Sequence, residues 1–438
     1  MAKVKKIFMP VMLIGVLVIA GLAGITSDVR AAVTDYEKVW EATFGGSGKD
    51  AFYSIAATPD GGCVVVGTSM LETGALMGLG NGESDAIIAK YSSTGVLQWA
   101  KNFGGSERED FRSVVLASDG GYVAVGSSDS ADGDLAGLNN GDYDAIIVKY
   151  SSTGVLQWAK NFGGSDYDYF YSVASTPDGG YVAVGSSDSA DDDLVGLNEG
   201  SRDAIIAKYS STGTLQWAKN FGGSEYDSFN SVALASDGGF VAVGYSESDD
   251  GDLTGLNKGD DDAIIVKFSS TGIPQWNKNF GGSGYDYFHS VASTADGGYV
   301  VAGRSSSTDG DLVGLNIGNI SDAIIIKFSS NGTVEWKRKH GGVKGDAFTS
   351  VAVTVDGGYA VAGVGGFDKG MFGDAVLIKY MDTTPPPPPI PPVDPPSSGL
   401  GGAIRFAGWS MLGLAVLSAA AILVLWAPKT KINRKGLK

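Results

Sequence analysis

Short apolar runs and glycine-containing turns alternate along residues 38–380. In one representative stretch the pattern predicts four β-strands, at Ser172–Ser175, Tyr181–Gly185, Ala204–Tyr209 and Leu215–Phe221. Pro-Asp-Gly-Gly joins the first two strands and Ser-Ser-Thr-Gly joins the last two, with glycine where a hairpin turn needs a positive φ. The second and third strands are nearly continuous apolar runs, which indicates that both of their faces are covered.

The same four-strand pattern occurs six times. Tryptophans mark it at spacings of 59, 59, 59, 59 and 60 residues, at Trp40, Trp99, Trp158, Trp217, Trp276 and Trp336. An Asp-Gly-Gly turn repeats with the same spacings, at Asp60, Asp119, Asp178, Asp237, Asp296 and Asp356. Four-stranded sheets that stack face to face around an axis form a β-propeller. The sequence therefore predicts an all-β, six-bladed propeller over residues 33–382.

The two ends of the repeat array predict how the ring closes. The last unit ends with the strand Asp374–Tyr380 and has no fourth strand before the prolines begin. The first unit is preceded by Lys38–Phe44, which matches a fourth strand. We therefore expect the N-terminal strand to be the outer strand of the sixth blade, since an open solenoid would need caps instead.

The repeats resemble those of exported prokaryotic cell-surface β-propeller proteins. The resemblance rests on Trp-x-Lys-Asn-Phe-Gly-Gly-Ser, then Asp-Gly-Gly-Tyr-Val-Ala-Val-Gly, then Asp-Ala-Ile-Ile-Val-Lys-Tyr, and it covers residues 38–380. It implies a propeller fold and an exported location, and it implies no particular activity. The Thr-Gly-Val-Leu-Gln-Trp stretch that ends at Trp158 also resembles quinoprotein propellers, in which this tryptophan docks between neighbouring blades.

The two termini are typical of a single-pass surface protein. Residues 1–32 are predicted to be a signal peptide, because three lysines precede an apolar run and a plausible cleavage site; an uncleaved anchor is the alternative. Residues 383–402 form a Pro-rich stalk. Residues 403–428 are predicted to be a transmembrane helix, and the basic tail 429–438 is then cytoplasmic, with the propeller outside the cell.

Composition narrows the possible chemistry. Residues 33–382 hold 47 of the 49 acidic and 22 of the 32 basic residues, a net charge of −25, so we expect no nucleic-acid partner. The single cysteine, Cys63, excludes an intrachain disulfide, and two histidines make a His-ligated zinc site unlikely on composition alone. We expect a monomeric propeller whose long loops, between the second and third strands and between blades, give one face a strongly negative charge.

Aspartates gather in the loop between the second and third strands of four blades. Several carboxylates and a glycine within a few residues suit a hard cation, so Ca²⁺ is the candidate cofactor. The alternative is an exposed turn in which Asp and Ser bond to nearby backbone. The candidate calcium ligands are Asp129, Asp132, Asp134, Asp188, Asp191, Asp193, Asp250, Asp252, Asp309 and Asp311.

These features predict a membrane-anchored surface propeller for binding, adhesion or scaffolding, with an extracellular protein or glycan as its ligand. The alternative is an extracellular carbohydrate-active hydrolase or lyase. The active site of an enzyme should contain residues near the axis that are not repeated in every blade. The residues of this kind that stand out in the sequence are Arg112, Arg304 and His289. No catalytic residue is therefore assigned. The acids that repeat in every blade are expected to fix the inter-blade loops.

Overall fold

The computed structural model describes residues 39–46, 48–70, 82–198, 200–315, 320–367 and 373–381. The chain divides into two units, residues 1–41 and 42–438, and the second unit contains all the strands. No helix among the described residues is long and apolar enough to cross a membrane. The predicted signal peptide, stalk, transmembrane segment and tail lie outside the described residues.

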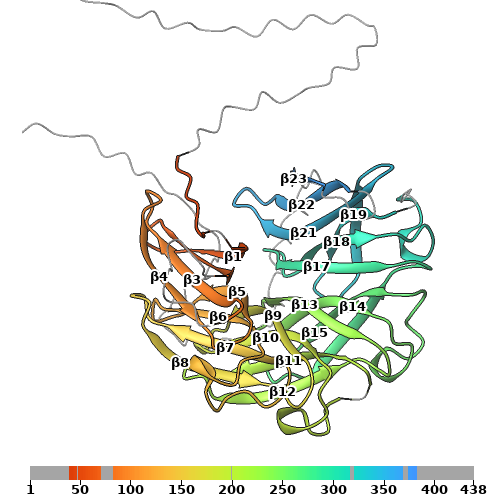
Figure 1. The fold of residues 1–438 in the computed structure, drawn as a ribbon. Coiled ribbons are helices and arrows are strands. Elements are labelled where there is room, and N and C mark those ends of the chain that lie inside the picture. Colours follow the sequence, from red (N-terminus) through yellow and green to blue (C-terminus); the bar gives the residue numbers. More distant parts are fainter. Residues whose placement is uncertain are drawn as a thin grey trace, which may run out of the picture. The chain divides into compact units, whose positions relative to one another are not determined.

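Six antiparallel sheets follow one another along the chain (Figure 1). The first three are β1 (Asp50–Ala57), β2 (Cys63–Ser69), β3 (Asp85–Tyr91) and β4 (Leu97–Phe103); β5 (Glu109–Leu116), β6 (Tyr122–Ser128), β7 (Asp144–Tyr150) and β8 (Leu156–Phe162); and β9 (Asp168–Ser175), β10 (Tyr181–Ser187), β11 (Asp203–Tyr209) and β12 (Leu215–Phe221). The others are β13 (Asp227–Leu234), β14 (Phe240–Ser246), β15 (Asp262–Phe268) and β16 (Pro274–Phe280); β17 (Asp286–Ser293), β18 (Tyr299–Ser305), β19 (Asp322–Phe328) and β20 (Val334–His340); and β21 (Gly345–Val353), β22 (Tyr359–Phe367) and β23 (Asp374–Tyr380). The all-β, six-bladed prediction is confirmed.

The hydrophobic core lies between successive blades. Val125 and Ile147 of the second blade, for example, pack with Val173, Ala183 and Ile205 of the third. In the first five blades the second and third strands are buried on both faces, as their continuous apolar pattern predicted, whereas β23 of the sixth blade is partly exposed. Each blade therefore completes its core only against its neighbour.

A tryptophan from the fourth strand docks between neighbouring blades. The Trp158 ring lies 6.2 Å from the Tyr181 ring of the next blade. Gly213, in the turn between β11 and β12, covers the same indole: a Cβ atom on Gly213 would lie 2.8 Å from the ring of Trp158. The glycine of the Ser-Ser-Thr-Gly turn therefore leaves room for the tryptophan as well as adopting a positive φ of 77°.

The expected closing strand is not formed. Residues 39–46 are irregular, with Val39 85% exposed, and the sixth sheet has three strands, β21, β22 and β23. In the other blades the tryptophan packs on an aromatic ring at the start of the next second strand. Blade one has Cys63 at that position, where the other blades have Tyr or Phe. The described residues 39–44 form no strand, so the closing strand predicted at Lys38–Phe44 is not found in the part of the chain that the structure describes.

Candidate ligand-binding site at the propeller axis

The first strand of every blade contains a β-bulge at the same place. In β9 the register jumps between Phe170 and Ser172, which leaves Tyr171 without a partner on β10. A bulge bends its strand and re-aims the extra side chain, and bulges are common next to functional sites. The six bulged residues are Tyr53, Arg112, Tyr171, Asn230, His289 and Thr349. The bulge is thus constant, whereas the side chain that it presents differs between blades.

A glycine on the second strand allows each bulge to form. A Cβ atom on Gly185 would lie 1.7 Å from the carbonyl oxygen of Tyr169, closer than any side chain tolerates. The same close approach occurs in all six blades, opposite Gly67, Gly126, Gly185, Gly244, Gly303 and Gly363. The glycine that follows the apolar run of each second strand is therefore a requirement of the bulge.

The first strands of successive blades, from β1 through β5, β9, β13 and β17 to β21, lie side by side around the axis (Figure 1). A serine hydroxyl on one strand accepts a hydrogen bond from a valine N–H on the next: Ser113 from Val173 at 3.3 Å, and Ser290 from Val351 at 3.1 Å. The bulged residue directly precedes this serine in every blade. The bonds therefore bring the bulged residues to one level, and we call the six of them the axial ring.

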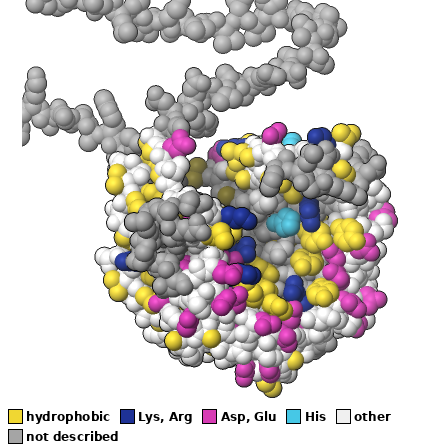
Figure 2. Space-filling view, in the orientation of Figure 1, with side chains coloured by type: hydrophobic (Ala, Val, Ile, Leu, Met, Phe, Trp, Pro, Cys, Tyr) yellow, Lys and Arg dark blue, Asp and Glu magenta, His cyan; other side chains and the backbone are white. Residues whose placement is uncertain are grey.

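Basic and aromatic groups surround the hollow at the axis. Figure 2 shows Lys or Arg side chains and a histidine around a central depression, with acidic side chains mainly on the surrounding rim. The Arg112 guanidinium lies 4.7 Å from the Tyr53 ring and pairs with Asp110 at 2.5 Å. The long-loop face is therefore not uniformly anionic, because its centre carries positive charge.

His289 is held neutral in the fifth blade. Its ring stacks on Tyr287 with centroids 6.1 Å apart and an interplanar angle of 4°. Burial, and then the positive charge of Arg304, lower the pKa of His289 to about 4. At neutral pH the imidazole thus has one N–H donor and one acceptor nitrogen.

Arg304 and Tyr287 form a cation–π pair beside the axial ring. The Arg304 guanidinium lies 4.6 Å from the Tyr287 ring centroid, and the Tyr287 hydroxyl donates to Asp261. Tyr245 meets the Tyr287 ring edge-on at 5.0 Å. Burial, and then the negative charge of Asp261, raise the pKa of the neighbouring Glu247. This part of the site therefore combines a cation, aromatic faces and a carboxyl group that accepts a proton readily.

A row of tyrosines leads from the rim to the axis. Tyr167, Tyr169 and Tyr171 alternate along the third blade, and successive rings are inclined by only 8° with centroids 6.5 and 5.9 Å apart. Tyr143 stacks against the outer two at 6.0 and 5.7 Å. Tyr167 is 40% exposed. The row therefore offers an amphipathic surface with aromatic bodies and hydroxyl tips.

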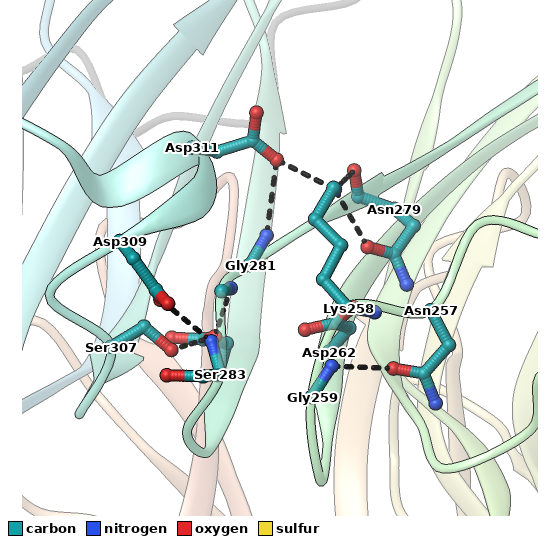
Figure 3. A network of polar contacts seen from close by, with 12 residues as sticks. Asn257, Lys258, Gly259, Asp262, Asn279, Gly281, Ser283, Ser307, Asp309 and Asp311 are labelled. Carbon is teal, nitrogen blue, oxygen red and sulfur yellow. Dashed lines mark hydrogen bonds and ion pairs between the residues drawn. The ribbon is translucent and has the colours of Figure 1, made fainter.

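The candidate calcium ligands mainly hold neighbouring loops in place. Asp309 accepts a hydrogen bond from Ser283 N at 2.7 Å, and Asp311 accepts from Gly281 N at 3.2 Å and pairs with Lys258 at 2.8 Å (Figure 3). In the other blades Asp132, Asp191 and Asp250 accept from serine N–H groups at 2.7–2.8 Å, and Asp134 and Asp252 from glycine N–H groups at 3.3–3.4 Å.

The three remaining candidates have other roles. Asp188 pairs with both nitrogens of the Arg202 fork at 2.5 and 2.9 Å. Asp129 accepts from Arg108 N at 2.5 Å, and burial raises the pKa of Asp193. Within the described ranges no three acidic, histidine or cysteine side chains converge on a metal position. In the described residues these aspartates act as hydrogen-bond and ion-pair acceptors, and calcium binding stays a prediction from the sequence.

A pair of buried carboxylates lies at each of several blade junctions. Asp168 of β9 accepts from Gly164 N at 2.8 Å, and Asp144 of β7 accepts from Asn161 Nδ2 at 2.9 Å. A Cβ atom on Gly163 would touch both carboxylates, at 2.4 and 2.8 Å. Burial raises the pKa of Asp168 to about 6, and the charge of Asp144 adds to the effect. As predicted, the repeated acids fix the inter-blade loops.

Comparison with known proteins adds little to the assignment of function. The chain is similar to the regulatory protein FlaEY of Caulobacter vibrioides. The two are 28% identical over 178 residues, which make up 38% of this chain and 18% of FlaEY, so the chain spans less than a fifth of that relative. No protein-family model matches the chain.

Solved structures are similar to the chain only at low sequence identity. Hydrazine synthase of Kuenenia stuttgartiensis has a TM-score of 0.45 at 11% identity, over 74% of this chain and 80% of that chain. Sqt1 of Chaetomium thermophilum has a TM-score of 0.41 at 12% identity, over 73% and 68% of the two chains.

The sequence prediction named Arg112 and His289 but not the other four residues of the axial ring, because it rested on the residues that the repeats have in common. Tyr171 and Asn230 occupy the same position of the repeat as Arg112 and His289, between an invariant Phe and an invariant Ser. The informative feature of the sequence is one position that varies between the six repeats while the residues on either side of it do not. Arg202, which directly precedes a third strand, and Tyr245, on a second strand, lie at two other positions of the repeat that vary between blades.

Proposed function

We propose that this protein is a membrane-anchored cell-surface binding module whose ligand contacts the axial ring. The observation that carries the binding role is the constant bulge with a variable side chain. A residue needed only for folding is expected to be alike in all six blades, whereas these positions hold Tyr, Arg, Tyr, Asn, His and Thr. A rigid scaffold that gathers differing polar side chains at one place is suited to recognition.

The proposed anchoring rests on the sequence of the C-terminal region. Phe406–Ala427 is free of charged residues and is long enough to span a bilayer as a helix, and a basic tail follows it. The single cysteine provides a direct test, because Cys63 is buried and therefore protected from reagents. We expect Ser93→Cys, at an exposed turn of the first blade, to react with a membrane-impermeant maleimide on intact cells.

Two controls make this labelling decisive. The wild-type chain should stay unlabelled, and Gly436→Cys in the basic tail should react only after the cells are permeabilised. Labelling of Gly436→Cys on intact cells, or of Ser93→Cys only after permeabilisation, would contradict the proposed orientation.

A carbohydrate-active hydrolase or lyase is the second candidate. Glu247 favours it, because its raised pKa is the property that a general acid needs. Other acids near the axis are engaged, Asp110 by Arg112 and Asp188 by Arg202. Shortening of an oligosaccharide by the full-length protein, but not by Glu247→Gln, would favour the enzyme over the binding module.

A further inference from the structure

We propose that the axial site binds an oligosaccharide that carries a carboxylate, and that Arg304 contacts this carboxylate. The inference rests on the proposed binding function and specifies its ligand class. It combines three observations: an arginine that forms no ion pair in the described part of the chain, a surface of planar polar groups, and inner strand edges that are already hydrogen bonded.

Arg304 differs from the other arginines of this face. Arg112 pairs with Asp110, Arg202 with Asp188 and Arg108 with Glu83. Among the residues that the structure describes, the contact found for the Arg304 guanidinium is with the face of Tyr287. A cation–π contact of this kind does not use the guanidinium as a hydrogen-bond donor, so its N–H groups can still bond to a ligand. That planar fork matches the two oxygens of a carboxylate.

The groups around Arg304 suit a sugar better than an apolar ligand. Every residue of the axial ring ends in a hydroxyl, amide, imidazole or guanidinium group, and none is aliphatic. Neutral His289 offers one donor and one acceptor to ring hydroxyls. In the first blade Tyr53 is 46% exposed beside Arg112, and an exposed aromatic ring suits the C–H face of a pyranose. The ring therefore combines hydroxyl recognition with stacking.

The inner strand edges argue against an extended peptide. A peptide that added a strand at the axis would need free backbone groups there. The valine N–H groups nearest the axial ring already bond to serine hydroxyls of the neighbouring blade. The net charge of −25 for residues 33–382 also opposes a densely charged polyanion. A sugar chain with isolated carboxylates avoids both difficulties.

Calorimetric titration of the full-length protein in detergent tests this proposal. The probes are glucuronate- and galacturonate-containing oligosaccharides and their carboxyl-reduced, neutral counterparts. We expect an acidic oligosaccharide to bind more tightly than its reduced form. Arg304→Gln should weaken the acidic probe by roughly tenfold or more and remove this preference, because a charge-assisted contact is lost. Arg304→Lys, which keeps the charge but not the fork, should lose less affinity.

Arg338→Gln is the matched control, because Arg338 stacks on Trp336 of the outer strand β20 and should not affect binding. Melting temperatures of all variants establish that they are folded. The proposal is overturned if no acidic oligosaccharide binds, if acidic and reduced forms bind equally, or if Arg304→Gln binds like the wild type. Binding of an acidic peptide instead of the sugars would also overturn it, while leaving the surface binding function intact.

Discussion

Lowering the pH from about 7.5 to about 5 is expected to stabilise the folded propeller. Asp168, Asp227 and Asp262 are buried, and burial raises the pKa of each to about 6. Because these values lie above those of an unfolded chain, the folded state binds protons more tightly. The stability that protonation provides is complete below the unfolded pKa of 3.8 and is lost as the pH rises through about 6.

The size of this stabilisation follows from the difference between the folded and unfolded pKa values. A change from 3.8 to about 6 corresponds to about 3 kcal/mol for one group, as an upper value. The three contributions do not simply add, since each group neighbours a second buried carboxylate and the pair titrates together. At lower pH, protonation of other carboxylates destabilises the folded state. Hydrogen bonds from Thr58 and Thr176, first among the causes, lower the pKa of Asp60 and Asp178 to about 2. Stability is therefore expected to peak between about pH 4 and 6.

Thermal melting of the full-length protein, followed by tryptophan fluorescence across this pH range, measures the effect. Asp168→Asn should reduce the rise in melting temperature between neutral and mildly acidic pH, because it removes one titrating group. Asp166→Asn is the matched control, since that carboxylate is exposed in the same loop. A wild-type melting temperature that is constant or falls from about pH 7.5 to 5 would refute the reasoning, as would a full rise in Asp168→Asn.

Two further predictions concern the bulge and the Asp-rich loops. Gly185→Ala places a Cβ atom 1.7 Å from a carbonyl oxygen and should destabilise the fold by about 3 kcal/mol or more, whereas Gly238→Ala, with a positive φ and no atom within 4 Å, should cost about 1–2 kcal/mol. Equal losses of melting temperature in these two variants would contradict the role given to the bulge. Because Asp132, Asp191, Asp250 and Asp309 bond to backbone N–H groups, millimolar Ca²⁺ should raise the melting temperature no more than Mg²⁺ does. A rise specific to Ca²⁺, lost in Asp250→Asn, would instead support the calcium sites predicted from the sequence.

The sequence was most informative where one pattern is repeated and fully buried. The fourth strand predicted at Leu215–Phe221 has the observed bounds of β12, and the predicted second and third strands differ from β10 and β11 by one or two residues at an end. Continuous apolar runs and two kinds of glycine turn fix these strands locally. The number of blades follows from the repeat count.

The first strand was predicted least well, and it holds the candidate site. β9 begins at Asp168, four residues before the predicted start at Ser172. The bulge at Tyr171 breaks the alternation by which a strand is recognised, so the part that faces the axis looked like a loop. A single-residue bulge depends on the close approach of a glycine on another strand. That approach is a tertiary contact, and the residues of the first strand alone do not reveal it.

The Asp-rich loops were ambiguous for a chemical reason. A carboxylate oxygen that can bind Ca²⁺ can also accept a hydrogen bond from a backbone N–H group, and the sequence does not separate the two. The partner of Asp309 is Ser283, in the loop between the fourth strand of one blade and the first strand of the next. The antiparallel pairing of β17 with β18, in which Asp286 lies opposite Ser305, brings these two residues together.

The bulge also has a consequence for how such proteins change over time. Because Gly185 and its counterparts hold the backbone, the residue at the bulge can be exchanged without altering the pairing of the strands. Duplication of a 59-residue unit then supplies a new blade whose specificity can diverge through substitution of one codon. The same property makes the six positions a compact target for a randomised library, from which binders of other ligands could be selected on an unchanged scaffold.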